Sequence, residues 1–327
     1  MISVILPTYN EEANLEALHV RLVAVADSLP EERFEFVFVD DCSTDRTAAL
    51  LDALRRADPR VHVIRFARNC GSHAAVAAGL AYCGGDCAVM LASDLQDPPE
   101  LIPRLLAAWR AGGKVVWGVR ERREGESVVV RATSRLYYYL MNRLTDVRQP
   151  PAGNDVFLID RAVIDAFNAV PEKNTSVYMV IAWLGFPQSH VLYVKEARHG
   201  GVSKWTASKR FKLFFDSLVA FSYTPLRFMS LVGSSCAFIG LLYGLLVVFN
   251  AVTGRVPNPG WASLMVVVLV IGGLQMLMLG VLGEYLWRAY DEGRGRPRYV
   301  IERNTLVARS HPPSLGSDQR SAVSGQL

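Results

Sequence analysis

Two long apolar stretches near the C-terminus constrain the fold of this chain more than any other feature. Phe228–Val252 and Ala262–Leu286 carry almost no charged residues, and each exceeds the roughly 20 residues that a helix needs to cross a bilayer. Buried core helices of a soluble protein are the alternative, but such helices are usually shorter. We therefore predict a pair of transmembrane helices.

The charged residues around these stretches predict their orientation. The connection between the stretches, residues 253–260, holds only Arg255. Basic residues are concentrated before the first stretch and after the second: Lys204, Lys209, Arg210, Lys212 and Arg227, then Arg288, Arg294, Arg296 and Arg298. The positive-inside rule places both flanks in the cytoplasm. We expect an integral protein of the inner or plasma membrane whose N-terminal domain is cytoplasmic.

The overall charge argues against nucleic acid as a partner. Lys and Arg total 35 and Asp and Glu total 31, which gives a formal net charge of only +4. The five cysteines are odd in number and scattered, as in a reduced cytosolic domain. Cys83 and Cys87 have the spacing of metal ligands, but no second Cys/His pair accompanies them, so we interpret them as packing residues.

Apolar runs alternate with helical patterns through the N-terminal part of the chain. Strands are expected at Ile2–Leu6, Phe34–Val39, Val61–Phe66, Ala88–Leu91 and Val115–Val119. Helices are expected at Glu11–Ser28, Thr44–Ala57 (capped by Ser43 or Thr44), Ser72–Tyr82 and Pro99–Arg110. This alternation predicts an α/β fold with a mostly parallel, Rossmann-like sheet, whose ligand site lies at the carboxyl ends of the strands.

Polar residues gather where these strands end. The five ends supply a tyrosine, carboxylates, a glycine turn and arginines: Pro7, Tyr9, Glu11, Asp40, Asp41, Arg68, Gly71, Asp94, Gln96 and Arg120. A nucleoside diphosphate needs an acceptor for its base or ribose, a flat stacking surface, a metal and cations. The chain contains neither G-x-G-x-x-G nor G-x-x-x-x-G-K-[ST], which excludes the usual dinucleotide fold and the P-loop NTPases.

The fourth strand end is a candidate metal site. Asp94 and Gln96 are hard oxygen donors two residues apart, and Pro98-Pro99 keeps the following chain extended before a helix begins. This pattern suits Mg²⁺ or Mn²⁺, which takes its remaining ligands from water and a substrate phosphate. An Asx-turn, in which Asp94 and Asp97 accept backbone hydrogen bonds, is the structural alternative.

Four motifs together resemble one enzyme family. They are VILPTYNEEANL, VDDCSTDRT, ARNCGSHAAVAAGL and SDLQDPPELI, and a downstream SKW accompanies them. The chain resembles family 2 glycosyltransferases of the GT-A fold, in particular the polyprenyl-phosphate glycosyltransferases, from about Ile2 to Arg298.

The resemblance implies roles for the donor-side residues. Pro7, Tyr9, Glu11 and Ser93 would line the nucleotide pocket, with Asp40 or Asp41 on the base or ribose and Arg68 near the base. Asp94 and Gln96 would hold Mg²⁺ or Mn²⁺ on the diphosphate. The chain departs from the family pattern at Ala92, where the usual triplet has an acidic residue, and at Cys42 and Cys70.

The resemblance also implies an acceptor side. Arg120 or Arg135 would approach the diphosphate, and Asp155 would face the acceptor, although Phe157 and Asn154 depart from the family motif. Asp160 is expected to cap a helix. A glycine-containing basic loop would grip a lipid phosphate through Arg198, Ser203 and Lys204. Ala207–Phe221 is expected to be an amphipathic helix at the membrane surface.

The expected organisation has four parts. Residues 1–200 form the GT-A domain, 201–227 the acceptor-phosphate loop and interfacial helix, 228–287 the transmembrane hairpin, and 288–327 a cytoplasmic tail with a disordered end. The expected reaction is transfer of a sugar, with inversion, from a nucleotide sugar, UDP being favoured, to a polyprenyl phosphate for modification of a cell-envelope glycan. The resemblance allows a homo-oligomer.

Two other functions are compatible with the fold. A processive polysaccharide synthase would carry a Q-x-x-R-W signature and more membrane spans, and the sequence shows no such signature. A membrane-anchored, non-catalytic sugar-nucleotide-binding scaffold would explain the missing carboxylate at Ala92.

Overall fold

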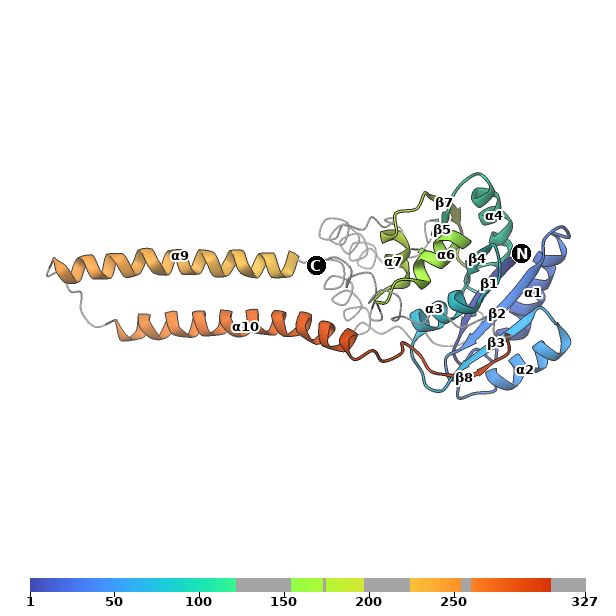
Figure 1. Ribbon diagram of the computed structural model, residues 1–327, viewed down its shortest axis with the longest axis horizontal. Coiled ribbons are helices and arrows are strands. Elements are labelled where there is room, and N and C mark those ends of the chain that lie inside the picture. Colours follow the sequence, from blue (N-terminus) through green and yellow to red (C-terminus); the bar gives the residue numbers. More distant parts are fainter. Residues whose placement is uncertain (122–153, 173–174, 197–223, 254–259, 307–327) are drawn as a thin grey trace, which may run out of the picture.

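The structure is a computed structural model of the whole chain, and it describes residues 1–121, 154–172, 175–196, 224–253 and 260–306 (Figure 1). The strands are β1 (Ile2–Thr8), β2 (Phe34–Asp40), β3 (Val61–Phe66), β4 (Cys87–Met90), β5 (Val115–Arg120), β6 (Asn154–Asp160), β7 (Gln188–Tyr193) and β8 (Ile301–Asn304). The helices are α1 (Leu15–Asp27), α2 (Thr47–Ala57), α3 (Ser72–Tyr82), the short 3-10 helix η1 (Pro99–Leu101), α4 (Ile102–Arg110), α6 (Arg161–Asn168), α7 (Val177–Trp183), α9 (Thr224–Val252) and α10 (Trp261–Gly293).

The strands form one eight-stranded sheet in the order β7-β5-β6-β4-β1-β2-β3-β8. Strands β1 to β4 pair in parallel, as do β5 and β7, whereas β6 and β8 are antiparallel to their neighbours. The carboxyl ends of β1–β5 and β7 therefore meet at one edge of the sheet, together with the amino ends of β6 and β8. We call this the carboxyl edge.

Apolar side chains cover both faces of the sheet. On one face, Leu15, Leu18 and Leu22 of α1 are buried together with apolar residues of β1 and β2, and Leu105 and Leu106 of α4 lie against β5 and β6. On the other face, α3, α6 and α7 pack on β4, β5 and β6, around Trp117 and Phe157. The central strands are buried along almost their whole length, as expected for parallel strands covered on both sides. The predicted α/β fold with a mostly parallel sheet is confirmed, and the antiparallel strands β6 and β8 make the sheet mixed.

Helix α3 lies unusually close to β1, at Gly79. A Cβ atom on Gly79 would lie 2.3 Å from Cγ2 of Ile5. We expect Gly79→Ala to lower the free energy of unfolding by about 1–3 kcal/mol, because the helix must move away from the strand. Urea unfolding followed by fluorescence measures the change. Gly280→Ala is the control, since no atom lies within 4 Å of its Cβ position; equal stability of Gly79→Ala and wild type would contradict the packing described.

The chain returns to the sheet after the second apolar helix. Strand β8 pairs antiparallel with β3, Tyr299 stacks on Phe66 with ring centroids 5.0 Å apart, and Thr305 Oγ1 accepts a hydrogen bond from the Val63 backbone at 2.7 Å. The sequence analysis had assigned residues 288–327 to a tail and gave them no place in the sheet. The segment that leaves the apolar hairpin thus completes one edge of the sheet.

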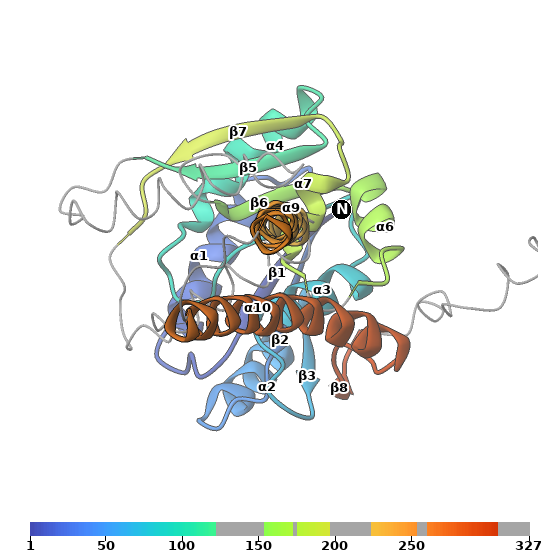
Figure 2. The same cartoon turned by 90° about the vertical axis from the view of Figure 1, so that its left-hand side faces the viewer.

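Helices α9 and α10 project together from the sheet domain (Figure 1). In the view along the hairpin, α9 is seen nearly end-on (Figure 2). Large apolar side chains are exposed along both helices, among them Phe238, Leu242, Phe249, Leu279 and Leu286. Among the described residues, one segment, Val270–Gly293, is long and apolar enough to cross a membrane, and none of its most apolar window is buried. Phe228–Tyr243 in α9 is apolar but shorter. Two membrane spans therefore stay a prediction.

Several expected elements agree with the structure and others differ. Val61–Phe66 and Ser72–Tyr82 have the predicted bounds, and Asp160 caps α6 by accepting a hydrogen bond from the Ala162 backbone at 3.1 Å. The predicted cap of the second helix is wrong, because this helix begins at Thr47 and Arg46 is its N-cap residue. Strand β6 was not predicted; the sequence analysis interpreted Asn154–Arg161 only as a motif.

Candidate active site at the carboxyl edge of the sheet

Three residues in left-handed backbone conformations lie at the carboxyl edge. They are Asn10, Cys42 and Leu95, with φ of 52°, 60° and 59°, and they follow β1, β2 and β4. Residues other than glycine rarely adopt this conformation, and leucine does so least readily of the three. Such conformations persist only where the surrounding structure enforces them, and they concentrate at functional sites. Three adjacent strand ends are therefore held in unusual turns.

Ser93 connects the turns after β1 and β4. Its Oγ donates to the carbonyl oxygen of Pro7 at 3.0 Å and lies 3.0 Å from Thr8 Oγ1, and the residue is buried. Pro7, near the end of β1, and Tyr9, in the turn that follows, are both partly buried. Glu11 accepts a hydrogen bond from Asn14 Nδ2 at 2.7 Å, and its backbone N–H donates to Thr47 Oγ1 at 2.9 Å. These contacts fix the backbone around the predicted nucleotide pocket.

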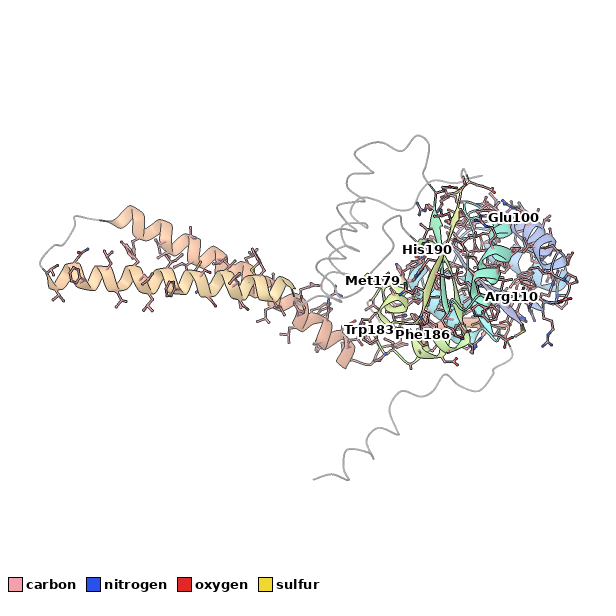
Figure 3. All side chains as sticks on the ribbon, turned by 90° about the horizontal axis from the view of Figure 1, so that it is seen from above. Glu100, Arg110, Met179, Trp183, Phe186 and His190 are labelled. Atoms are coloured by element: carbon pink, nitrogen blue, oxygen red, sulfur yellow. The ribbon has the colours of Figure 1, made fainter. Side chains whose placement is uncertain are left out.

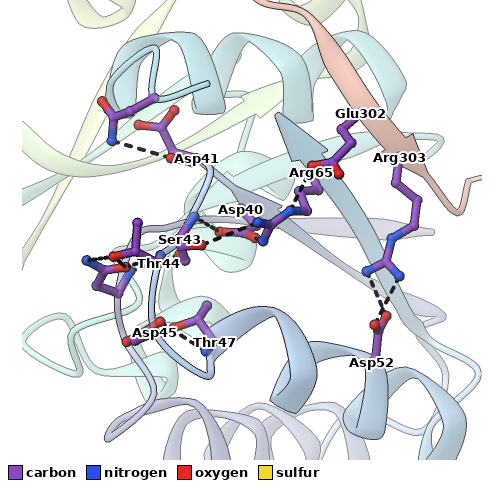
Figure 4. Close-up of polar contacts among 12 residues, drawn as sticks. Asp40, Asp41, Ser43, Thr44, Asp45, Thr47, Asp52, Arg65, Glu302 and Arg303 are labelled. Atoms are coloured by element: carbon purple, nitrogen blue, oxygen red, sulfur yellow. Dashed lines mark hydrogen bonds and ion pairs between the residues drawn. The ribbon is translucent and has the colours of Figure 1, made fainter. Parts of the chain in front are cut away.

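Asp40 is held entirely within the protein. It is 0% exposed; its Oδ1 accepts a hydrogen bond from the Ser43 backbone at 2.9 Å, and its Oδ2 pairs with Arg65 Nη1. Arg65 in turn pairs through Nε with Glu302 of β8 at 2.9 Å (Figure 4). The chain Asp40–Arg65–Glu302 therefore links the second strand end to the strand that follows the apolar hairpin.

Asp41 shapes the loop before α3. Its two carboxylate oxygens accept hydrogen bonds from the backbone N–H groups of Cys70 at 2.6 Å and Gly71 at 2.8 Å. Burial raises the pKa of Asp41 above its usual range, although these two hydrogen bonds oppose the shift. Gly71 has φ of 89°, which favours glycine. Arg68, the predicted base-side residue, is exposed on this loop.

His73 follows this loop and makes stability depend on pH. Burial, with a smaller effect of the Arg298 charge, lowers the pKa of His73 to about 4, from about 6.5 when unfolded. The neutral ring therefore contributes its full stability above pH 6.5 and loses it as the pH falls towards 4. Between pH 7.5 and 5 we expect the free energy of unfolding to fall by about 2 kcal/mol more for wild type than for His73→Gln. Urea unfolding at the two pH values measures this, and equal pH dependence of both proteins would refute it.

Asp94 and Gln96 lie at the end of β4, and both are partly exposed. Asp94 Oδ1 accepts a hydrogen bond from the Gln96 backbone at 3.2 Å, so the Asx-turn alternative is present at Asp94, whereas the Asp97 carboxylate accepts its hydrogen bond from the Tyr193 side chain. Among the described residues no group of three His, Cys, Asp or Glu side chains could hold a metal. One carboxylate and one amide oxygen fit a hard cation that takes most of its ligands from water and substrate phosphate.

A charged cluster that the sequence analysis did not identify lies beside this turn. Asp97 is 0% exposed, accepts a hydrogen bond from Tyr193 Oη at 2.6 Å and lies 3.4 Å from Lys195 Nζ. Burial lowers the pKa of Lys195 and raises that of Tyr193, and the charge of Arg120 acts on both groups. Arg120 ends β5. The cluster joins residues about 100 positions apart, and no local pattern in the sequence indicated it.

Strand β6 brings Asp155 to the same edge. Because β6 runs antiparallel between β4 and β5, its first residues lie beside the last residues of its neighbours; Asn154 pairs with Val119, and Phe157 pairs with Met90. The backbone of Asp155 therefore lies at the edge that carries Asp94 and Arg120. The Asp155 side chain and the predicted residues Arg135, Arg198, Ser203 and Lys204 lie outside what the structure describes.

The sequence profile described as "Glycosyl transferase family 2" matches residues 3–167, which include the turns after β1 to β5 and all of β6. The chain belongs to this family. Its predicted family membership and its identification as a glycosyltransferase are thereby confirmed.

Curated relatives extend the family match over most of the chain. An uncharacterized glycosyltransferase (sll0501) of Synechocystis sp. is 36% identical over 300 residues, which cover 92% of this chain and 94% of the relative. The bactoprenol glucosyl transferase of Shigella phage SfX is 34% identical over 301 residues, covering 92% and 98%. Among solved structures, glucosyl-3-phosphoglycerate synthase from Mycobacterium tuberculosis is 24% identical, covering 67% of this chain and 79% of that one, with a TM-score of 0.45.

Proposed function

We propose that this family 2 glycosyltransferase moves a sugar from a nucleotide sugar to a polyprenyl phosphate at the cytoplasmic face of a membrane. The observation that carries the proposal is the register of β6, which brings the Asp155 backbone to the edge where Asp94 follows β4 and Arg120 ends β5. Transfer between a donor diphosphate and an acceptor phosphate needs polar groups for both at one place, and the carboxyl edge brings such groups together. Relatives named bactoprenol glucosyl transferases, 33–34% identical over nearly their whole length, support a polyprenyl acceptor.

The donor would bind at the carboxyl edge, as in a GT-A domain. Pro7, Tyr9 and Glu11 would form one side of the nucleotide pocket, and Arg68 would lie near the base. Both carboxylate oxygens of Asp40 and of Asp41 are already engaged by the protein. The proposed role of the two carboxylates is therefore to hold the turns that contact the nucleotide. The backbone groups of Asp40 and Asp41, or the neighbouring Ser43, would contact the ribose.

Asp94 and Gln96 would hold Mg²⁺ or Mn²⁺ on the donor diphosphate, where the ion would neutralise the charge that develops on the leaving group. Arg120 would add a second positive charge beside the same diphosphate, in a partly buried place where electrostatic interactions are stronger than in water. Uridine is proposed as the base and glucose as the first sugar to test, because the named relatives are glucosyl transferases.

The acceptor chemistry needs no strong general base. The second pKa of a phosphate monoester is about 6, so the lipid phosphate is largely dianionic at neutral pH. One of its oxygens would bond to the anomeric carbon while the bond from that carbon to the diphosphate oxygen breaks, and the diphosphate leaves with the electron pair. Attack from the opposite side inverts the anomeric centre. Asp155 would position the acceptor, and Arg198, Ser203 and Lys204 would bind its phosphate.

The apolar helices fit a lipid acceptor. The apolar side chains of α9 and α10 are exposed, and we propose that both helices cross the membrane with the sheet domain in the cytoplasm. Met179 and Trp183 lie on the side of the domain towards the hairpin, whereas Glu100 and Arg110 lie on the far side (Figure 3). An exposed tryptophan on that side suits a membrane interface, where its ring and its N–H are both accommodated.

A panel of radiolabelled sugar nucleotides tests the proposal. Membranes containing the protein and polyprenyl phosphate would be incubated with UDP-glucose, UDP-N-acetylglucosamine and GDP-mannose, and the label in the organic phase would be counted. We expect one donor to label the lipid. Binding of a nucleotide without transfer from any donor would instead favour the non-catalytic scaffold, which the alanine at position 92 makes the second candidate.

A further inference from the structure

The turn Asp94–Asp97 carries the candidate metal ligands in a backbone conformation that it would not adopt by itself. Leu95 has φ of 59° and is 1% exposed, so its side chain is buried while its backbone is strained. Asp94 and Gln96 flank Leu95 in this turn, and both are partly exposed. A conformation of this kind persists only if contacts outside the turn enforce it.

Those contacts come from the end of β7 and the residues that follow it. Tyr193 Oη donates to Asp97 Oδ1 at 2.6 Å, and Lys195 Nζ lies 3.4 Å from the same oxygen. The backbone N–H of Glu196 donates to the carbonyl oxygen of Gln96 at 2.9 Å. We call these three contacts the β7 tie. They hold the turn at two successive residues, one of which is itself a candidate metal ligand.

A second bridge holds the segments on both sides of the turn. Arg21 of α1 makes a bidentate pair with Glu100, at 3.0 Å and 2.6 Å, and another with Glu196, at 2.9 Å and 2.8 Å. Glu100 lies three residues after Asp97, and the backbone of Glu196 takes part in the β7 tie. The two segments are therefore joined through one guanidinium on the outside as well as through Asp97 on the inside.

Stability alone does not account for the buried part of the β7 tie. The side chain of Lys195 is 9% exposed and that of Asp97 is 0% exposed, and Asp97 Oδ2 has no hydrogen-bond partner among the described residues. Removing two charges from water costs free energy, and apolar residues of similar size in place of a buried ion pair often give a protein that is equally stable or more stable. A buried pair of this kind is better explained by the geometry that it enforces.

We propose that Asp97, Tyr193 and Lys195 are positioning residues that hold Asp94 and Gln96 in their metal-binding arrangement. This inference rests on the proposed function. The segment that supplies Tyr193 and Lys195 leads, two residues after Glu196, to Arg198, the first of the predicted acceptor-phosphate residues. The β7 tie thus connects the turn that would hold the donor's metal to the start of the predicted acceptor loop.

Hydrogen exchange and Mn²⁺ affinity test the inference in the full-length protein in detergent. Lys195→Met is expected to speed amide exchange in peptides covering residues 91–101 and to weaken Mn²⁺ binding in the presence of UDP or GDP by about 10- to 100-fold, as loss of residues that orient metal ligands usually does. Lys195→Arg keeps the charge and should recover most of the affinity. Tyr193→Phe is a second variant, which serves if Lys195→Met does not fold. It keeps the ring and loses the hydrogen bond to Asp97, and it should also speed amide exchange and weaken Mn²⁺ binding.

Lys114→Met is the matched control. Lys114 Nζ pairs with Asp160 at 2.9 Å, at the opposite end of β5 from Arg120, so its loss should leave the turn and the Mn²⁺ affinity unchanged. If Lys195→Met and Tyr193→Phe lower the melting temperature but leave exchange in residues 91–101 and Mn²⁺ affinity at wild-type values, the β7 tie is only structural and the inference is wrong. Failure of the wild-type protein to bind Mn²⁺ with either nucleotide would overturn the proposed function, and the inference with it.

Discussion

Replacing Asp94 by alanine is expected to lower the rate of sugar transfer by at least about a hundredfold, the loss typical for removal of a group that stabilises charge in the transition state. Asp94 is the one carboxylate in the predicted metal-binding pair, since Ala92 precedes it where the family usually has another acid. The residue is partly exposed and its one hydrogen bond within the turn is lost, so the free energy of unfolding should fall by only about 1 kcal/mol. Transfer rates at saturating donor and acceptor, with urea unfolding in parallel, measure both effects.

Two further variants make this result specific. Asp94→Asn retains an acceptor for the Gln96 backbone but loses the negative charge, and it should be nearly as inactive as the alanine variant. Asp165→Ala, which removes an exposed carboxylate from α6, should transfer at the wild-type rate. Near-normal turnover by Asp94→Ala would show that the end of β4 does not hold a catalytic metal.

Replacing Arg65 by alanine is expected to have the largest effect on stability, about 3 kcal/mol, because it leaves the Asp40 carboxylate buried without its cation. Asp40 is 0% exposed, so water cannot replace the guanidinium without opening the turn after β2. The same opening would move Ser43, whose Oγ accepts a hydrogen bond from the Asn10 backbone at 2.9 Å. Urea unfolding should therefore show a lower midpoint, and the KM for the sugar nucleotide should rise.

Glu302→Gln is the control for this prediction. Glu302 is exposed and pairs with the other side of Arg65, and exposed ion pairs contribute only about 0–1 kcal/mol. Loss of the Glu302–Arg65 pair should hardly change the free energy of unfolding, because Asp40 still has Arg65 as its partner. Equal destabilisation by Arg65→Ala and Glu302→Gln would mean that the buried pair has no special importance and that β8 is stabilised chiefly by this outer contact.

Much of the sheet could be predicted because its signals are local. The strands β1 to β5 are short, largely apolar runs, and α3 is an alanine-rich helix that follows a glycine turn. Strand β6 was missed because its sequence was interpreted through its motif, and β8 because it follows the apolar hairpin and gains its partner, β3, only in the folded protein. Neither pairing can be read from a local pattern.

The predicted helix cap failed for a related reason. Ser43 and Thr44 resemble capping residues, but the Ser43 hydroxyl accepts a hydrogen bond from the Asn10 backbone N–H, and the Thr44 hydroxyl accepts one from the Asn10 side chain, in the turn after β1. Tertiary contacts therefore took over the groups that a local rule assigns to the helix. The same holds at the candidate site: the strand ends were predicted, whereas the left-handed Leu95 and the pairing of Asp97 with Lys195 depend on residues distant in the sequence.

The most direct test of the account compares two acceptors that differ only in their phosphate. Purified protein in lipid vesicles would receive a labelled sugar nucleotide and Mg²⁺ or Mn²⁺, with either undecaprenyl phosphate or undecaprenol in the bilayer. The account predicts that label enters the organic phase with the phosphate, that chelation of the metal abolishes it, and that the free alcohol remains unlabelled. Equal labelling of both lipids, or no labelling of the phosphate with any donor, would contradict it.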